Sequence, residues 1–336
     1  MRRYPSRRGT IAAVMTTLLA VAGGAAPRRA AAQGGLADQA ALFLLLPVGA
    51  RAVGVGHAMA AANGTSDAVW WNPSGIAAIS KRDASLHHSQ SVFGRGDALT
   101  FAVSSSLLGV VALSANILDF GGEIPAVDNQ GNQVGTILPR NIAAVATYAT
   151  EIGKRVRTGV SYKLVQFRFD CRGQCPDLPT SQASTNALDI GVQYDFQSRL
   201  PITVGAVIRN IGVSLQVKDN PQSDPLPTRL QIGAAARYAL PKEVAADAEV
   251  RLAVDLIGEI PVGTPLPRFG AEFGWEKRAF VRAGYVVEAA NTESGGPSLG
   301  LGFVAGRFVI DFARVFTGLS VDAGQAPTHL SLRVTF

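Results

Sequence analysis

The end of the chain alternates strictly between apolar and polar residues. From Thr328 to Phe336, every second residue is leucine, valine or phenylalanine, and the residues between them include a histidine, a serine and Arg333. Successive side chains of a β-strand point to opposite faces, so this segment predicts a strand with one apolar face and one polar face. Such a strand suits a wall between lipid and a polar lumen. We expect the terminal Phe336 to act as a signal for the machinery that assembles outer-membrane barrels.

The same alternation recurs along the chain, for example at 250–256 and 269–275. Segments of this kind, bounded by Gly, Pro, Asn or Asp, predict fourteen strands, at 84–93, 97–107, 109–119, 139–150, 155–169, 185–197, 201–217, 227–239, 247–258, 266–277, 279–288, 296–304, 307–317 and 327–336. Bacterial single-chain barrels have an even number of strands. The sequence therefore predicts an all-β fold, a 14-stranded antiparallel transmembrane β-barrel.

The connections between these strands alternate in length. Short ones, such as 151–154, 197–200 and 305–306, alternate with long ones rich in Pro and Gly, and only the first connection, 94–96, breaks the alternation. Outer-membrane barrels pair short periplasmic turns with longer extracellular loops. We therefore expect an outer-membrane protein in contact with lipid, with its amino and carboxyl termini on the periplasmic side.

The charge of the chain is concentrated at its beginning. The net charge is +6, but six arginines precede residue 33 with no acidic residue among them, so the rest is formally neutral. Charged residues make up 17% of the chain, against roughly 25% in average soluble domains. The basic balance thus belongs to a targeting segment, and nucleic acid is not an expected partner.

Three regions follow from these patterns. A basic start, an apolar stretch from Ile11 to about Ala22 and small residues at 30–32 predict a removed export signal over 1–32. Residues 33–83 are apolar and rich in glycine without a period of two, which predicts a plug or hatch segment inside the barrel. Residues 84–336 form the predicted barrel.

The only two cysteines, Cys171 and Cys175, lie in one predicted outer loop. In an exported chain this pair predicts a disulfide that closes a small loop. Metal binding is the weaker alternative, because no histidine is close in sequence. We expect neither a bound metal nor a cofactor.

Nine ionisable residues fall on the predicted inner face. Charges there can pair with one another or meet water, so they predict an internal salt-bridge network, with a permeation path as the alternative. They are Lys163, Arg209, Arg237, Arg251, Asp255, Glu272, Arg282, Asp311 and Arg333.

The segment before the first strand carries two glycine-containing motifs. Gly49-Ala-Arg-Ala-Val-Gly-Val-Gly56 is followed by Asp67-Ala-Val-Trp-Trp-Asn-Pro-Ser-Gly75, and a helix is predicted at 66–71, capped by Ser66 or Thr65 and ended by Asn72-Pro73. These two motifs resemble the opening of the PorV/PorQ family within the FadL-like outer-membrane barrels, and Arg209-Asn210-Ile-Gly212, at the end of the seventh predicted strand, is a further match. The resemblance implies a fourteen-stranded barrel whose hatch is carried by Arg51, Gly54, Gly56, Asp67, Trp70, Trp71, Asn72, Pro73 and Gly75. A purely structural role for these residues is the alternative to ligand contact.

Two functions are compatible with the resemblance. The PorV/PorQ type implies binding or shuttling of secreted cargo proteins in a type IX secretion-like system, with a secretion channel as partner. The FadL-like fold implies the alternative, a channel for hydrophobic small molecules. An enzyme is not expected, because the four histidines and the polar residues near them do not assemble a nucleophile, a base and an orienting group.

Overall fold

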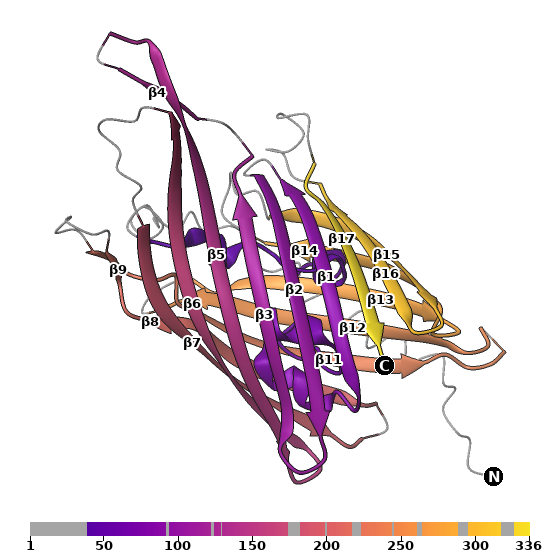
Figure 1. Cartoon of the computed structure of the whole chain (residues 1–336). Helices are drawn as coiled ribbons and strands as arrows, with labels where there is room; N and C mark the ends of the chain where they lie inside the picture. The colour runs from indigo at the N-terminus through magenta and orange to yellow at the C-terminus, as the bar shows by residue number, and fades with distance from the viewer. Residues whose placement is uncertain are drawn as a thin grey trace, which may run out of the picture. The chain divides into compact units, whose positions relative to one another are not determined.

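Fourteen antiparallel strands close into one barrel (Figure 1). The computed structural model describes residues 39–336 except 92–93, 122–123, 129, 174–181, 199, 217–222, 244, 261–263, 288–294 and 317–325. Each strand pairs with its neighbour in the wall, and pairing of β3 with β5 closes the circle. The wall strands are β1 (Arg82–Ser91), β2 (Gly94–Ser105), β3 (Gly109–Asp119), β5 (Gln133–Ile152), β6 (Val156–Gly173), β7 (Gln182–Phe196), β8 (Ile202–Gly212), β11 (Arg229–Ala239), β12 (Ala248–Glu259), β13 (Leu266–Trp275), β14 (Ala279–Val286), β15 (Gly296–Ala305), β16 (Phe308–Val315) and β17 (Thr328–Thr335). The predicted fold class is confirmed.

Three shorter strands were not predicted from the sequence. β4 (Ile124–Val127) pairs with the first residues of β5, so a segment expected to be loop extends the sheet beyond the wall. β9 (Leu215–Gln216) and β10 (Ser223–Asp224) form a separate two-stranded sheet. The predicted strand 201–217 ends instead at Gly212, shortly after Asn210 takes a positive φ of 60° and the β7–β8 register shifts.

The two faces of the wall differ as the alternation requires. Leu332 and Leu330 on β17 are 43% and 48% exposed, whereas Ser331 between them is 3% exposed. The same contrast runs along β16, where Phe312 is exposed and Asp311 and Ala313 are buried. A closed wall with an apolar outer face is the arrangement of an outer-membrane barrel. Within the described residues, no helix combines the length and the apolar character that a bilayer-spanning helix needs.

The described chain begins and ends at opposite ends of the barrel. Phe336 exchanges backbone hydrogen bonds with Arg82, where the short turns lie; we call this the turn end. The Ala40 nitrogen donates to the Pro225 oxygen, beyond the carboxyl end of β8; we call this the loop end. The amino terminus itself lies outside the described residues, so the predicted periplasmic side of both termini stays a prediction.

Residues 39–80, which we call the N-terminal segment, pass between these two ends within the ring of strands (Figure 1). Their short helices are η1 (Leu42–Leu45), α2 (Ala50–Gly54), η2 (Ser66–Trp70) and η3 (Pro73–Ala78). The helix predicted at 66–71 is thus a 3-10 helix one residue shorter, and Thr65 precedes it without a side-chain cap. The region boundaries at residues 32 and 83 stay predictions.

Candidate functional site

Glycines of the wall let the N-terminal segment lie directly against the inner face. A Cβ atom on Gly284 would lie 2.0 Å from the Gly56 nitrogen, and one on Gly205 would lie 2.0 Å from the Ala60 oxygen. Gly270 meets Val55 in the same way. Backbone therefore packs on backbone from β8 round to β14, which only residues without a Cβ allow.

The first predicted hatch motif, in α2 and just after it, contacts β13 to β15. The Arg51 guanidinium lies 3.2 Å from the Glu272 carboxylate, which raises the pKa of Arg51 and keeps it charged. Gly54 approaches the Cα atom of Gly300, and Gly56, at a φ of +58°, would place a Cβ 2.5 Å from the Phe269 oxygen. The structure thus brings Arg51, Gly54 and Gly56 together against one part of the wall.

The two tryptophans of the second motif donate hydrogen bonds to different parts of the protein. The Trp70 indole nitrogen donates to the Thr100 hydroxyl at 3.1 Å, and that of Trp71 donates to the Val48 oxygen at 3.0 Å. His57 stacks on Trp71 at 5.3 Å, and the Arg209 guanidinium lies 5.4 Å from a Trp71 ring centre. Burial lowers the pKa of His57 well below its usual value. His57 and Arg209 therefore both contact Trp71, whose indole nitrogen binds the Val48 oxygen.

Asn72 is the most connected residue of the second motif. It is fully buried, its amide donates to the Ala60 oxygen at 2.7 Å, and its Oδ1 accepts from the Ser74 hydroxyl and backbone. It caps η3, which Pro73 begins. Two further members of the motif contact other parts of the protein: Asp67 is 3.4 Å from the His87 ring, and a Cβ on Gly75 would lie 2.3 Å from the Ala62 oxygen.

We expect Asn72→Ala to destabilise the protein by about 2–3 kcal/mol, because it removes a helix cap and one of the two side-chain amides that donate to the buried Ala60 oxygen. Urea unfolding in detergent micelles, followed by tryptophan fluorescence, measures this. Asn63→Ala is the matched control, since Asn63 is only partly buried and its side-chain oxygen accepts from the exposed Arg237. Equal urea midpoints for the two variants would contradict the prediction that the hydrogen bonds of Asn72 stabilise the fold.

The predicted lumen charges form several separate groups rather than one network. Glu272 accepts hydrogen bonds from both Arg51 and Arg282, and Arg282 also forms an ion pair with Asp311 at 2.7 Å. Elsewhere Lys163 pairs with Asp189 at 2.7 Å, and Arg333 lies 3.6 Å from Asp83.

Three other predicted charges contact the N-terminal segment directly. Arg209 donates to the Trp70 oxygen, Asp255 accepts from the Ala60 nitrogen at 2.8 Å, and the exposed Arg237 reaches Asn63. Within the described part of the chain, both terminal nitrogens of the buried Arg251 lack a hydrogen-bond partner. The charged side chains of the lumen thus bind the N-terminal segment as well as pairing with one another.

Uncharged polar residues that were not predicted also hold the segment. The Gln193 amide donates to the oxygens of Ala60 and Ala62, and the Ser298 hydroxyl donates to the Val53 oxygen at 2.7 Å. The signal in the sequence that could have identified these residues is their position on the inward face of a strand. A buried glutamine on a strand of this kind needs a partner, and in this lumen the partner is the backbone of the segment.

Two predicted features are untested by this geometry. Cys175 lies outside the described residues, so the Cys171–Cys175 disulfide stays a prediction. Phe336 is 46% exposed at the turn end, and its role as an assembly signal stays a prediction. Within the described residues no three His, Cys, Asp or Glu side chains are grouped to hold a metal.

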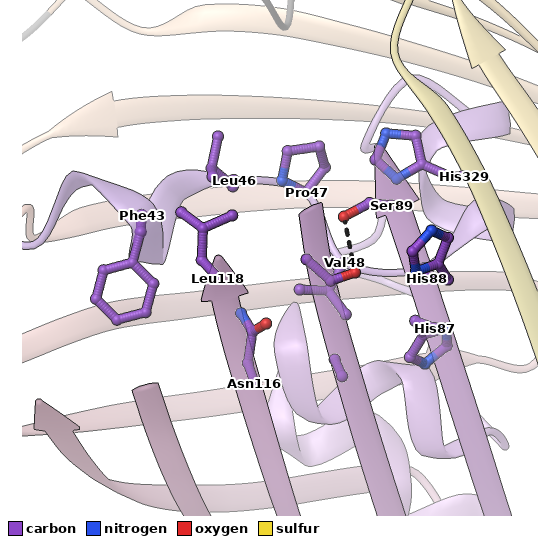
Figure 2. Close-up of a pocket in the computed structure, with 13 residues that line it drawn as sticks. Phe43, Leu46, Pro47, Val48, His87, His88, Ser89, Asn116, Leu118 and His329 are labelled. Carbon is purple, nitrogen blue, oxygen red and sulfur yellow. Dashed lines mark hydrogen bonds between the residues drawn. The ribbon is translucent and has the colours of Figure 1, made fainter. Parts of the chain in front are cut away.

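Two small cavities lie between the N-terminal segment and the wall. The first is near the loop end, between Phe43, Leu46, Val48 and strands β1, β2, β3 and β17 (Figure 2). The second is deeper, between Leu46, the two tryptophans and strands β3, β5, β6 and β8. Leu46, Val48 and Asn116 line both. Each cavity measures about 20 Å³, room for about one water molecule, whereas a benzene-binding cavity measures about 150 Å³.

Comparison with solved structures agrees with this architecture. The Ralstonia pickettii toluene transporter TbuX matches with a TM-score of 0.53 at 13% identity, over 86% of this chain and 98% of that chain. The CymD monoaromatic hydrocarbon channel matches with a TM-score of 0.53 at 12% identity, over 87% and 98%. The Pseudomonas putida toluene transporter TodX matches with a TM-score of 0.50 at 10% identity, over 84% and 95%.

The likeness is one of fold. No protein-family model and no curated protein matches the sequence, and identities this low do not carry function. The resemblance to the FadL-like barrels is therefore confirmed for the architecture, whereas the narrower PorV/PorQ assignment stays a prediction. The same holds for the expectation that the chain is not an enzyme.

Proposed function

We propose that this barrel passes small hydrophobic molecules across the outer membrane, and that the N-terminal segment is its movable plug. The observation that carries the proposal is the pair of mostly apolar cavities on either side of Leu46 and Val48. They lie in series from the loop end toward the middle of the lumen. Displacing these two side chains would join them into one space.

The structures with the same fold support this function over the secretion role. Those named above are described as transporters or channels of toluene and other monoaromatic hydrocarbons. The segment is held by hydrogen bonds, the Arg51–Glu272 ion pair and close packing, and it has no cysteine that could cross-link it to the wall. It can therefore shift without breaking the wall. Binding of secreted cargo stays a prediction from the sequence resemblance.

We expect Leu46→Ala to raise the initial rate of toluene uptake several-fold, because it removes the side chain that separates the two cavities. Uptake of radiolabelled toluene by cells carrying the barrel measures this. Leu42→Ala is the matched control, since Leu42 belongs to the same segment, is 42% exposed and lines neither cavity. Equal uptake by the two variants would argue against a path at Leu46.

A second variant tests the plug itself. Deleting residues 33–80 while keeping the export signal removes the segment and leaves the polar inner face open to water. We expect this variant to admit small polar solutes, which the intact protein excludes, in a liposome-swelling assay. Exclusion of polar solutes by a folded deletion variant would overturn the plug role.

A further inference from the structure

We propose that the first cavity binds small aromatic alcohols, with the ligand hydroxyl on His329 and the ring against Phe43, Leu46 and Leu118. This inference rests on the proposed function and narrows its substrate class. It concerns one cavity and one hydrogen bond, so it can fail while hydrocarbon passage stands.

The cavity has an apolar end and a polar end (Figure 2). Phe43, Leu46 and Leu118 lie on one side, where Phe43 also contacts Phe167 edge-to-face at 5.6 Å. His87, Ser89 and His329 lie on the other, on the paired strands β1 and β17. This division suits a ligand with a hydrophobic body and one polar group.

Among the described residues, His329 is the polar residue at this end with a buried nitrogen that lacks a hydrogen-bond partner. The nitrogens of His87 contact the hydroxyls of Ser331 at 2.8 Å and Ser85 at 3.1 Å, and the Ser89 hydroxyl donates to the Gly96 oxygen. His329 is 4% exposed, and its Nδ1 has no hydrogen-bond partner among the described residues. A buried polar atom of this kind gains from any ligand that satisfies it.

The chemistry of the lining selects a hydroxyl over a charged group. No lysine, arginine, aspartate or glutamate lines the first cavity, and the Lys163 and Arg209 of the second already bind Asp189 and the Trp70 oxygen. A carboxylate or ammonium beside His329 would therefore be buried without a counter-charge, which is costly. A hydroxyl both donates and accepts, and therefore suits an imidazole nitrogen in either tautomer. A pure hydrocarbon would leave His329 unsatisfied.

Asn116 is the competing polar group, because it faces the same cavity. It is partly exposed, so a ligand that reaches it replaces a hydrogen bond to water and gains little. His329 Nδ1 is buried and has no hydrogen-bond partner within the described residues, so a ligand hydroxyl there adds a hydrogen bond without breaking one in the protein. The difference assigns the hydroxyl to His329. The first cavity has room for about one water molecule, so a ring fits only when Leu46 and Val48 shift toward the second cavity. The proposed function already requires this displacement.

Equilibrium binding of p-cresol and p-xylene to the purified full-length barrel in nanodiscs tests the assignment. The two molecules have nearly the same shape and differ by a hydroxyl in place of a methyl group. After correction for partition into empty nanodiscs, we expect p-cresol to bind about tenfold more tightly, or about 1.4 kcal/mol. His329→Leu should remove this preference, His329→Asn should retain part of it, and Asn116→Leu should leave it unchanged.

A second readout uses the unmodified protein, so it does not depend on the folding of a variant. In ¹⁵N NMR of histidine-labelled barrel, p-cresol should shift the His329 imidazole signal and p-xylene should not, with His57, which does not line the first cavity, as internal reference. Loss of the preference in Asn116→Leu but not in His329→Leu would overturn the assignment, as would equal binding of both ligands. Absence of binding of either ligand would instead overturn the proposed function, and this inference with it.

Discussion

Replacing Gly284 with valine should push the N-terminal segment off the wall and turn the closed barrel into an open one. The new Cβ would lie 2.0 Å from the Gly56 nitrogen and 2.5 Å from the Val55 carbonyl carbon. Both contacts are to backbone, so no rotamer change relieves them. The cost of forcing the segment to stay exceeds the typical overpacking penalty of about 1–3 kcal/mol. We therefore expect ion conductance in planar bilayers where the unmodified protein shows little.

The adjacent residue supplies the control. Ala283 lies next to Gly284 on β14 but faces outward and is exposed, so Ala283→Val adds the same side chain on the lipid side. It should leave conductance unchanged. If both variants fold, as judged by heat-modifiable migration on gels, and both stay closed, then the packing of Gly284 on Gly56 does not hold the segment in place.

The wall was predictable because its signal is local. Each strand shows the alternation with a period of two in its own sequence. The pattern alone therefore assigns Leu301 to the lipid face and Asp311 to the lumen face, without knowledge of the neighbouring strands. The β3 segment was predicted with its observed bounds, 109–119. The extensions of β5 and β6 were missed because they depend on pairing with each other and with β4 beyond the membrane wall.

The interior was less predictable because its contacts join residues far apart in the chain. That Glu272 lies on the inner face follows from alternation, but that it meets Arg51 depends on where the segment crosses the lumen. The same applies to the wall glycines, whose spacing within a strand does not reveal what packs on them. The hatch motifs predicted a segment with tight backbone contacts, and they did not indicate that Trp71 would fix Val48 between two cavities.

Glu272→Ala should be the most destabilising single change among the lumen charges. Glu272 is the one acid between two arginines, with bonds to Arg51 at 3.2 Å and to Arg282 at 2.6 Å. Arg282 keeps Asp311, but Arg51 has no second ion pair within the described residues. Breaking a buried ion pair from one side leaves an uncompensated charge, which costs about 3–5 kcal/mol. Glu249→Ala, which removes an exposed carboxylate on neighbouring β12, should cost little.

A double variant separates the charge effect from the loss of packing. In Arg51→Met/Glu272→Met both charges of the pair are gone and the volume is largely kept, so much of the stability should return. Urea unfolding of both single variants and the double variant in micelles gives the coupling, which we expect to be about 0.5–3 kcal/mol. Strictly additive losses would mean that Arg51 and Glu272 do not bind each other, and that other contacts, such as the glycine packing and the Ser298 bond to the Val53 oxygen, hold α2 on the wall.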